Sequence, residues 1–169
     1  MNSEYLTNND LIKYKFDSLG QNVKISKNAT MIGEKNISLG SNVRIDDYCI
    51  ISVKEGNLKI GNDVHIGGQS YLGCGGGLVL GNNINIAQGV KIYTKINDYS
   101  TFDGNKDKFI LGKIKIGDQV IIGSNSVLVG NCSVGEGTTI GALSFVKNDL
   151  KPWSVYAGNP CKFIKDRQK

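Results

Sequence analysis

The chain has 169 residues, of which 40% are hydrophobic and 21% charged, and its formal net charge is +5. This length and balance predict one globular domain with a buried core and exclude an intrinsically disordered protein. The sequence holds no apolar run of about 20 residues, so we expect no membrane span.

The cysteines and the first residues bear on the compartment. Cys49, Cys74, Cys132 and Cys161 share no Cys-x-x-Cys spacing, and residues 1–5 do not begin a secretory signal. We therefore expect reduced thiols, no metal site and a cytoplasmic protein. The basic residues near the end of the chain are not interleaved with aromatic ones, so nucleic acid is not an expected partner.

Residues 1–22 are predicted to form an N-terminal cap. Within them, polar residues precede the apolar ones of residues 8–16, which predicts a short helix with a polar N-cap. We expect this helix to cover the first turn of the repeat that follows, because a solenoid otherwise exposes its terminal strand edges.

Residues 23–150 carry a repeat of inward-facing residues. Alternate residues of a strand point to opposite faces, so two aliphatic residues two positions apart both point inward. In the first half the inward pairs, two of which have Cys49 or Ser70 in place of an aliphatic residue, are Ile37/Leu39, Val43/Ile45, Cys49/Ile51, Leu58/Ile60, Val64/Ile66, Ser70/Leu72, Leu78/Leu80, Ile84/Ile86 and Val90/Ile92. In the second half one row falls every six residues, at Ile116, Ile122, Leu128, Val134, Ile140 and Val146.

This six-residue period predicts the fold class. Glycine and asparagine tolerate the positive φ that a corner needs, and three sides close a coil of about 18 residues. Hexapeptide repeats are typical of an all-β, parallel β-helix. The spacings of three and four that an amphipathic helix requires are absent.

Two segments depart from the rhythm. Residues 93–113 lose the period, and we expect them to project as a loop from a corner. The glycine run from Cys74 to Gly77 lacks the Lys-Ser/Thr ending of a phosphate-binding loop, so it is interpreted as a tight corner. Beyond Leu150 the repeat stops, and residues 151–169 are expected to close the coil, with a short helix at residues 162–167.

Two stretches, IGSNSVLVGNCSVGEGTTIGALSFVKNDL and WSVYAGNPCKFIKDR, resemble the hexapeptide-repeat acyltransferases of the galactoside and maltose acetyltransferase group. The tract His65-Ile66-Gly67 and the loop sequence NDYS look like the branch that acylates bacterial surface sugars and nucleotide-linked sugars. The resemblance implies a left-handed coil, against the usual hand of parallel crossovers. It also implies a homotrimer with sites between subunits. The implied reaction is acetyl transfer from acetyl-CoA to a hydroxyl or amine of a sugar or nucleotide-linked sugar, in surface polysaccharide biosynthesis.

The same resemblance assigns CoA-binding positions. They are Ser124, Gly141, Ala142, Lys147, Lys162 and Lys165. The lysines make physical sense because ammonium groups pair with phosphates. Small residues at 141 and 142 are expected to leave backbone amides open to the pantetheine arm. The family usually has arginines where Lys162 and Lys165 stand.

The catalytic base is the least determined residue. In the galactoside group a loop histidine is the base, and the corresponding position falls at about Asn97, whose amide cannot accept a proton in this role. His65, the single histidine, is one candidate and Asp98 is the other. We expect Asn85 beside His65 on the next coil. Tyr93, Tyr99 and Ser100 are candidates for contact with the sugar.

Three other functions compete. A trimeric scaffold without activity is favoured by the missing loop histidine. An antibiotic acetyltransferase would share the fold and the donor. A zinc-dependent carbonic anhydrase also uses such coils, but its zinc needs three histidines and one per chain argues against it.

Overall fold

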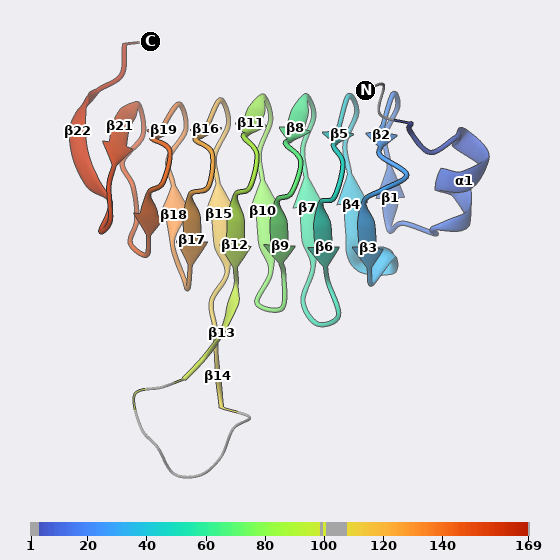
Figure 1. The fold of residues 1–169 in the computed structure, drawn as a ribbon, viewed down its shortest axis with the longest axis horizontal. Coiled ribbons are helices and arrows are strands. Elements are labelled where there is room, and N and C mark those ends of the chain that lie inside the picture. Colours follow the sequence, from blue (N-terminus) through green and yellow to red (C-terminus); the bar gives the residue numbers. More distant parts are fainter. Residues whose placement is uncertain (1–3, 99, 101–107, 169) are drawn as a thin grey trace.

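The computed structural model describes residues 4–98, 100 and 108–168. Over these residues the strands form three sheets, the sides of a left-handed β-helix, and one antiparallel hairpin (Figure 1). The sheets are parallel except at β22, the last strand of the second sheet. The all-β fold predicted from the hexapeptide period is confirmed.

Each sheet takes one strand from each successive coil. The first sheet contains β1 (Ser18–Leu19), β4 (Ile37–Leu39), β7 (Leu58–Ile60), β10 (Leu78–Leu80), β15 (Ile114–Ile116) and β18 (Ser133–Val134). The second contains β2 (Lys24–Ile25), β5 (Arg44–Ile45), β8 (Val64–Ile66), β11 (Ile84–Ile86), β16 (Ile121–Ile122), β19 (Thr139–Ile140), β21 (Ser154–Ala157) and β22 (Lys162–Asp166). The third contains β3 (Thr30–Ile32), β6 (Ile50–Ser52), β9 (Tyr71–Gly73), β12 (Lys91–Tyr93), β17 (Val127–Val129) and β20 (Phe145–Val146).

The predicted inward residues make the core. The aliphatic pairs of both halves are buried along the axis of the coil. Small polar residues in the same rows are buried too, and their hydroxyls are satisfied by backbone carbonyls: Ser126 Oγ and Ser144 Oγ donate to Gly141 O at 2.9 and 2.7 Å. A buried hydroxyl is tolerated where it finds such a partner, which explains why serine can replace an aliphatic residue in the repeat.

Coil length differs between the two halves. Arg44 pairs with His65 and His65 with Asn85, separations of 21 and 20 residues. Ile121 pairs with Thr139, a separation of 139 − 121 = 18 residues. The longer coils carry extra residues in the turns that lead into the next coil, such as the 3-10 turn η1 (Glu34–Asn36). The 18-residue coil predicted from the period therefore holds in the C-terminal half only.

A short helix covers the N-terminal end, as predicted. α1 (Asn8–Lys13) begins with a capping box in which the Thr7 hydroxyl accepts from the Asp10 amide and the Asp10 carboxylate accepts from the Thr7 amide. Leu11 is buried against the core. The helix lies beside the first coil and thereby shields one end of the solenoid (Figure 1).

The opposite end is closed differently from our expectation. Residues 162–167 were predicted to form a short helix, and this prediction is wrong: β22 is a strand that pairs antiparallel with β21. The last coil leaves a strand edge whose N–H and C=O groups need partners, and a strand supplies them where a helix cannot.

The interrupted segment leaves the coil between the third and first sheets. β13 (Lys95–Asn97) and β14 (Phe109–Leu111) pair as an antiparallel hairpin that projects away from the coils (Figure 1). The projection was predicted, but the paired strands at its base were not. In the part of the chain that the structure describes, no helix is long and apolar enough to cross a membrane.

Candidate active site

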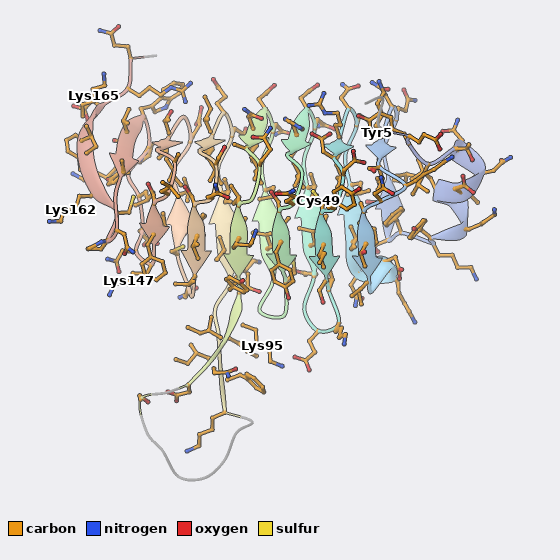
Figure 2. All side chains as sticks on the ribbon, viewed as in Figure 1. Tyr5, Cys49, Lys95, Lys147, Lys162 and Lys165 are labelled. Atoms are coloured by element: carbon orange, nitrogen blue, oxygen red, sulfur yellow. The ribbon has the colours of Figure 1, made fainter. Side chains whose placement is uncertain are left out.

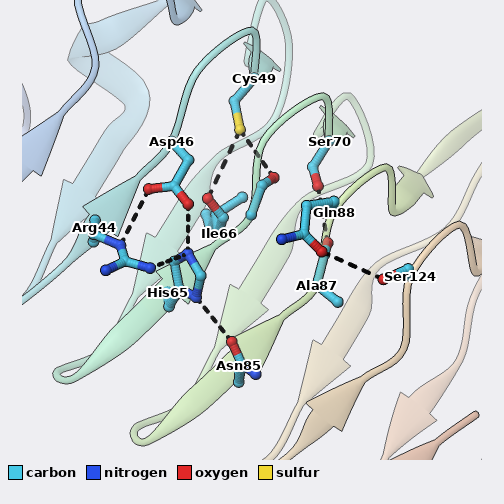
Figure 3. Close-up of polar contacts among 11 residues, drawn as sticks. Arg44, Asp46, Cys49, His65, Ile66, Ser70, Asn85, Ala87, Gln88 and Ser124 are labelled. Atoms are coloured by element: carbon cyan, nitrogen blue, oxygen red, sulfur yellow. Dashed lines mark hydrogen bonds and ion pairs between the residues drawn. The ribbon is translucent and has the colours of Figure 1, made fainter. Parts of the chain in front are cut away.

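A polar cluster occupies the outer face of the second sheet. Arg44, His65 and Asn85 are in register on β5, β8 and β11, so their side chains lie one above another (Figure 3). His65 Nδ1 lies 2.9 Å from Asn85 Oδ1, and His65 Nε2 lies 2.7 Å from Asp46 Oδ2. The predicted neighbourhood of His65 and Asn85 is thus present.

Arg44 completes this cluster, and the sequence analysis missed both it and Asp46. Arg44 Nε lies 3.1 Å from Asp46 Oδ1, and Arg44 Nη2 lies 2.7 Å from His65 Nε2. Both residues stand one coil before His65, so a search at the coil spacing could have found them. Which ring nitrogen carries the proton depends on the tautomer. In either tautomer both nitrogens of His65 face partners within the chain.

Asp98, the second candidate base, lies on the hairpin. Its carboxylate accepts from the Ser100 amide at 2.9 Å and from the Ser100 hydroxyl at 2.6 Å. These hydrogen bonds hold the pKa of the Asp98 carboxyl below its ordinary value of 3.8. Ser100 therefore orients Asp98 and keeps it ionised.

Asp98 and His65 are not brought together within one chain. The hairpin leaves the coil at the corner between β12 and β15, whereas β8 belongs to the sheet on the opposite side of the triangular coil (Figure 1). Tyr99, a candidate for contact with the sugar, lies outside the described residues. Tyr93 lies at the base of the hairpin, where its ring packs against Tyr71 with centroids 5.3 Å apart.

Four of the predicted CoA positions lie along the corner between the second and third sheets, which we call the corner column. Gly123 and Gly141 follow the paired strands β16 and β19, and Ala157 ends β21 and pairs with Lys162 on β22. A Cβ at Gly123 would lie 2.4 Å from the Ala142 amide nitrogen, so the coils touch here. Ser124, Gly141, Ala142 and Lys162 therefore share one edge of the molecule.

This edge can accept a ligand with hydrogen-bonding groups. Among the described residues, the amides of Ser124 and Ala142 donate to no protein acceptor. The Gly141 amide was expected to be open as well, but it donates to Tyr156 O at 2.8 Å. The residues present fit an extended arm with amide groups of its own, with Ser124 and Ala142, but not Gly141, as open donors.

The three predicted lysines are exposed but do not form one cluster. Lys162 and Lys165 project from β22 at the C-terminal end of the coil, and Lys147 lies below them after β20 (Figure 2). Lys165 pairs with Val155, in the row of side chains that contains His65. Lys162 thus stands at the end of the corner column, where a phosphate of a long ligand could reach it.

Gln88 links the column to the histidine cluster. It follows β11 at the same corner, and its Oε1 accepts from Ser124 Oγ at 3.4 Å (Figure 3). Going toward the N-terminus along this edge, four successive coils present Ser124, Gln88, Gly67-Gly68 and Asp46. The polar cluster and the open amides are two parts of one continuous surface.

Cys49, Cys74 and Cys132 do not offer a reactive thiolate. Burial raises the pKa of the Cys49 thiol to about 11, that of Cys74 to about 12 and that of Cys132 to about 11. Such thiols are protonated at neutral pH and inert. Over the described residues, no three His, Cys, Asp or Glu side chains are grouped as metal ligands would be.

Comparison with known proteins places this geometry in context. The pattern of the bacterial transferase hexapeptide family, with six repeats, matches residues 113–148. The chain is 37% identical to a dTDP-4-amino-4,6-dideoxy-D-glucose acyltransferase from Escherichia coli, and the match covers 98% of this chain and 90% of that protein.

Solved structures agree with this relationship. AntD, an N-acyltransferase from Bacillus cereus in complex with dTDP and 3-hydroxybutyryl-CoA, is 36% identical with a TM-score of 0.90, covering 99% of this chain and 92% of AntD. A variant of AntD bound to dTDP-4-amino-4,6-dideoxyglucose and coenzyme A is 37% identical with a TM-score of 0.92, covering 100% and 92%. A hexapeptide-repeat acetyltransferase from Vibrio cholerae with acetyl coenzyme A is 18% identical with a TM-score of 0.62, covering 95% of this chain and 78% of that one, and shares the fold.

Proposed function

The chain belongs to the bacterial hexapeptide-repeat acyltransferases, and we propose that it transfers an acyl group from an acyl-CoA to the amine of a dTDP-linked amino sugar. The observation that carries the proposal is the 37% identity to the E. coli enzyme named for dTDP-4-amino-4,6-dideoxy-D-glucose, over 98% of the chain. AntD is described as an N-acyltransferase, which favours an amine over a hydroxyl as acceptor. Acetyl-CoA is the proposed donor.

The donor would lie along the corner column. The open amides of Ser124 and Ala142 can donate to carbonyls of the pantetheine arm, and Lys162, Lys165 and Lys147 can pair with its phosphates. The thioester would then lie toward Gln88 and the histidine cluster. This assignment places the reacting carbonyl on the surface that joins the two parts of the site.

The chemistry requires removal of protons from the acceptor nitrogen. A neutral amine attacks the thioester carbonyl carbon and the carbon–sulfur bond breaks. From its ammonium form the nitrogen loses two protons; one ends on sulfur and one leaves through a base or solvent. We propose that Asp98 contacts the acceptor ammonium, because an ionised carboxylate attracts a positive charge. Within the described residues, Ser100 donates only to the Oδ1 atom of this carboxylate.

His65 is the alternative candidate base. Its imidazole is half-buried and bonded through both nitrogens, so it can take a substrate proton only after Asn85 leaves Nδ1, or Asp46 and Arg44 leave Nε2. Asp46 would stabilise the imidazolium that forms, as a carboxylate does beside a catalytic histidine.

We further propose a homotrimer with sites between subunits. Within one chain the hairpin carries Asp98 away from the second sheet, so a neighbouring copy is the means of bringing Asp98 to His65 and the corner column. The hairpin also exposes Phe109, Ile110 and Leu111, which are 43%, 45% and 59% accessible, and a neighbouring subunit would cover them. A cytoplasmic role in surface polysaccharide biosynthesis is part of the same proposal.

The test is acyl transfer measured with matched acceptors. Thiol release from acetyl-CoA and from 3-hydroxybutyryl-CoA is followed with dTDP-4-amino-4,6-dideoxyglucose, with its 4-hydroxy counterpart, with the free amino sugar and with a hydroxyl-bearing antibiotic. We expect turnover with the dTDP-linked amine and little with the other acceptors. Turnover with the antibiotic alone would replace the proposal, and CoA binding without turnover on any acceptor would favour the inactive scaffold.

A further inference from the structure

A pocket of about 270 Å³ lies where the hairpin joins the coil. Its walls come from β9, β12, β13 and β14 and from the turn after β6, and they include Tyr71, Gly73, Gly75, Tyr93, Lys95 and Phe109. It lies on the opposite side of the coil from β8, so within one chain it is separate from the histidine cluster. Neither the donor column nor the candidate bases account for it.

Gly73, at the end of β9, and Gly75, in the glycine run that follows it, shape this pocket. A Cβ at Gly73 would lie 2.9 Å from Cε1 of Tyr71, and a Cβ at Gly75 would lie 3.1 Å from side-chain atoms of Lys95. Glycine at these positions lets the Tyr71 ring lie down over the strand and lets the Lys95 stem pass close to the turn. The run that the sequence indicated only as a tight corner is therefore also the floor of a cavity.

The walls offer flat aromatic surface. The Tyr71 and Tyr93 rings are tilted by 35° with centroids 5.3 Å apart, which leaves no room for a base between them. A planar base can stack on the accessible face of one ring, as bases do on aromatic side chains. The small volume suits a one-ring base better than a two-ring base.

Charged and amide groups stand at the rim. Lys95 Nζ lies 2.7 Å from Glu55 Oε2 and 4.2 Å from the centroid of the Phe109 ring, so it ties the hairpin to the turn that carries Lys54 and Glu55. Lys54 is exposed and lines the same pocket, as does Asn97. The Asn97 amide can form hydrogen bonds with the polar edge of a pyrimidine. Lys54 and Lys95 together with the single carboxylate of Glu55 carry a net positive charge, which favours binding of phosphate.

From this combination we infer that the pocket holds the pyrimidine nucleoside diphosphate portion of the acceptor. The inference rests on the proposed function and deepens it, since it says where the nucleotide is bound and why a purine nucleotide is refused. Asn97 lies next to Asp98 in the chain, so a nucleotide here directs its sugar toward the hairpin carboxylate. Tyr93 then contacts the nucleobase, whereas the sequence analysis placed it against the sugar.

The test measures binding of dTDP and of CoA separately by calorimetry, on the full chain as it assembles. Tyr93→Ala removes the stacking face, and Gly73→Val pushes the Tyr71 ring away and fills the floor. Valine is compatible with this outward row because Val129 occupies it on β17, in register with Tyr93. Lys59→Ala, an exposed lysine on β7, is the control for general charge loss.

We expect Tyr93→Ala and Gly73→Val each to weaken dTDP binding by about 10- to 100-fold, the range for loss of base stacking. CoA affinity should stay within about two-fold, because the corner column is distant. Tyr93→Phe should restore most of the affinity that Tyr93→Ala loses, and ADP should bind wild type at least about ten-fold more weakly than dTDP.

The outcomes separate the inference from the function beneath it. If wild type binds dTDP and acylates its amino sugar while both variants bind dTDP as well as wild type, the nucleotide lies elsewhere and only the pocket assignment fails. If wild type binds CoA but no dTDP, the proposed acceptor and the pocket assignment fail together.

Discussion

His65 Nδ1 and Asn85 Oδ1 lie 2.9 Å apart although 20 residues separate them in the chain. The contact exists because each coil returns the chain to the same sheet, so residues in register on β8 and β11 face the same way. A side chain on this sheet is therefore adjacent to positions one coil away in both directions. The same rule brings Arg44 and Asp46 to His65 from the preceding coil.

The two candidate bases make different predictions on substitution. Asp98→Asn should lower kcat/KM for the dTDP-linked amine by about 10²-fold or more, the usual contribution of a group that handles the reacting proton. His65→Gln should lower it by less than about 10-fold, because both ring nitrogens are already bonded within the chain. CoA affinity should be unchanged in both variants, as measured by calorimetry. A large loss in His65→Gln with near-normal Asp98→Asn would transfer the role to His65.

Lysine substitutions test the donor column. Lys162→Ala and Lys165→Ala should each raise the Kd for CoA by about two- to five-fold at low salt, the range expected for exposed ion pairs. The difference should shrink at about 0.5 M salt, because screening weakens such pairs. Lys59→Ala on β7 serves as the control. Equal affinities for all four proteins at low salt would remove β22 from the donor site.

The N-terminal cap should respond to acid. The Thr7 hydroxyl and amide lower the pKa of the Asp10 carboxyl from 3.8 to about 2. Because the pKa in the folded chain is below the ordinary value, this stabilisation is complete above about pH 4 and is lost as the pH falls toward 2. Hydrogen exchange of the α1 amides should therefore accelerate between pH 4 and 2, beyond the intrinsic change, in wild type. In Asp10→Asn the α1 amides should already exchange rapidly at pH 5, and protection equal to wild type there would contradict the role of the cap.

Substitution at Gly76 tests how closely the coils approach each other at the base of the hairpin. A Cβ at this position would lie 2.4 Å from Thr94 O and 2.8 Å from the Gly112 amide nitrogen, which are backbone atoms that cannot rotate away. Gly76→Ala should lower the free energy of unfolding by about 1–3 kcal/mol, as overpacking does. At Gly130, with φ of 78° and nothing within 4 Å, Gly130→Asn should cost less than about 0.5 kcal/mol, since asparagine tolerates this conformation. Chemical denaturation of both variants measures the difference.

Arg167 should hold the closing strand in place. Its Nη1 donates to Gln119 O at 3.1 Å and to Gly137 O at 2.9 Å, so it ties the end of β22 to two successive coils. Arg167→Ala should lower the free energy of unfolding by about 1–2 kcal/mol through the loss of two charged hydrogen bonds. Arg167→Lys should recover little of this, because an ammonium group lacks the planar fork. Full stability in Arg167→Ala would assign the closure to the β21–β22 pairing alone.

Much of the fold follows from short-range pattern. The pairs of aliphatic residues and the corner residues repeat along the chain, and each coil buries its residues against the next, so one period describes the architecture. The polar start of the α1 segment is likewise a local signal. The β22 segment is different: its backbone pairs with β21 because an open strand edge lies beside it, and that is a property of the assembled coil.

The sequence by itself determined the β-helix, the capped N-terminus, the projecting segment and the adjacency of His65 and Asn85, because these depend on residues within one repeat or one repeat apart. The tertiary structure alone decided that Asp46 and Arg44 contact the imidazole of His65 and that the Gly141 amide donates to the Tyr156 carbonyl. It also decided that Gly73 and Gly75 form the floor of a pocket beside the hairpin. The physical reason is that these contacts depend on where side chains of different coils and a projecting hairpin meet in space. A period along the chain specifies the rows but not the rotamers, the hydrogen bonds or the gaps between them.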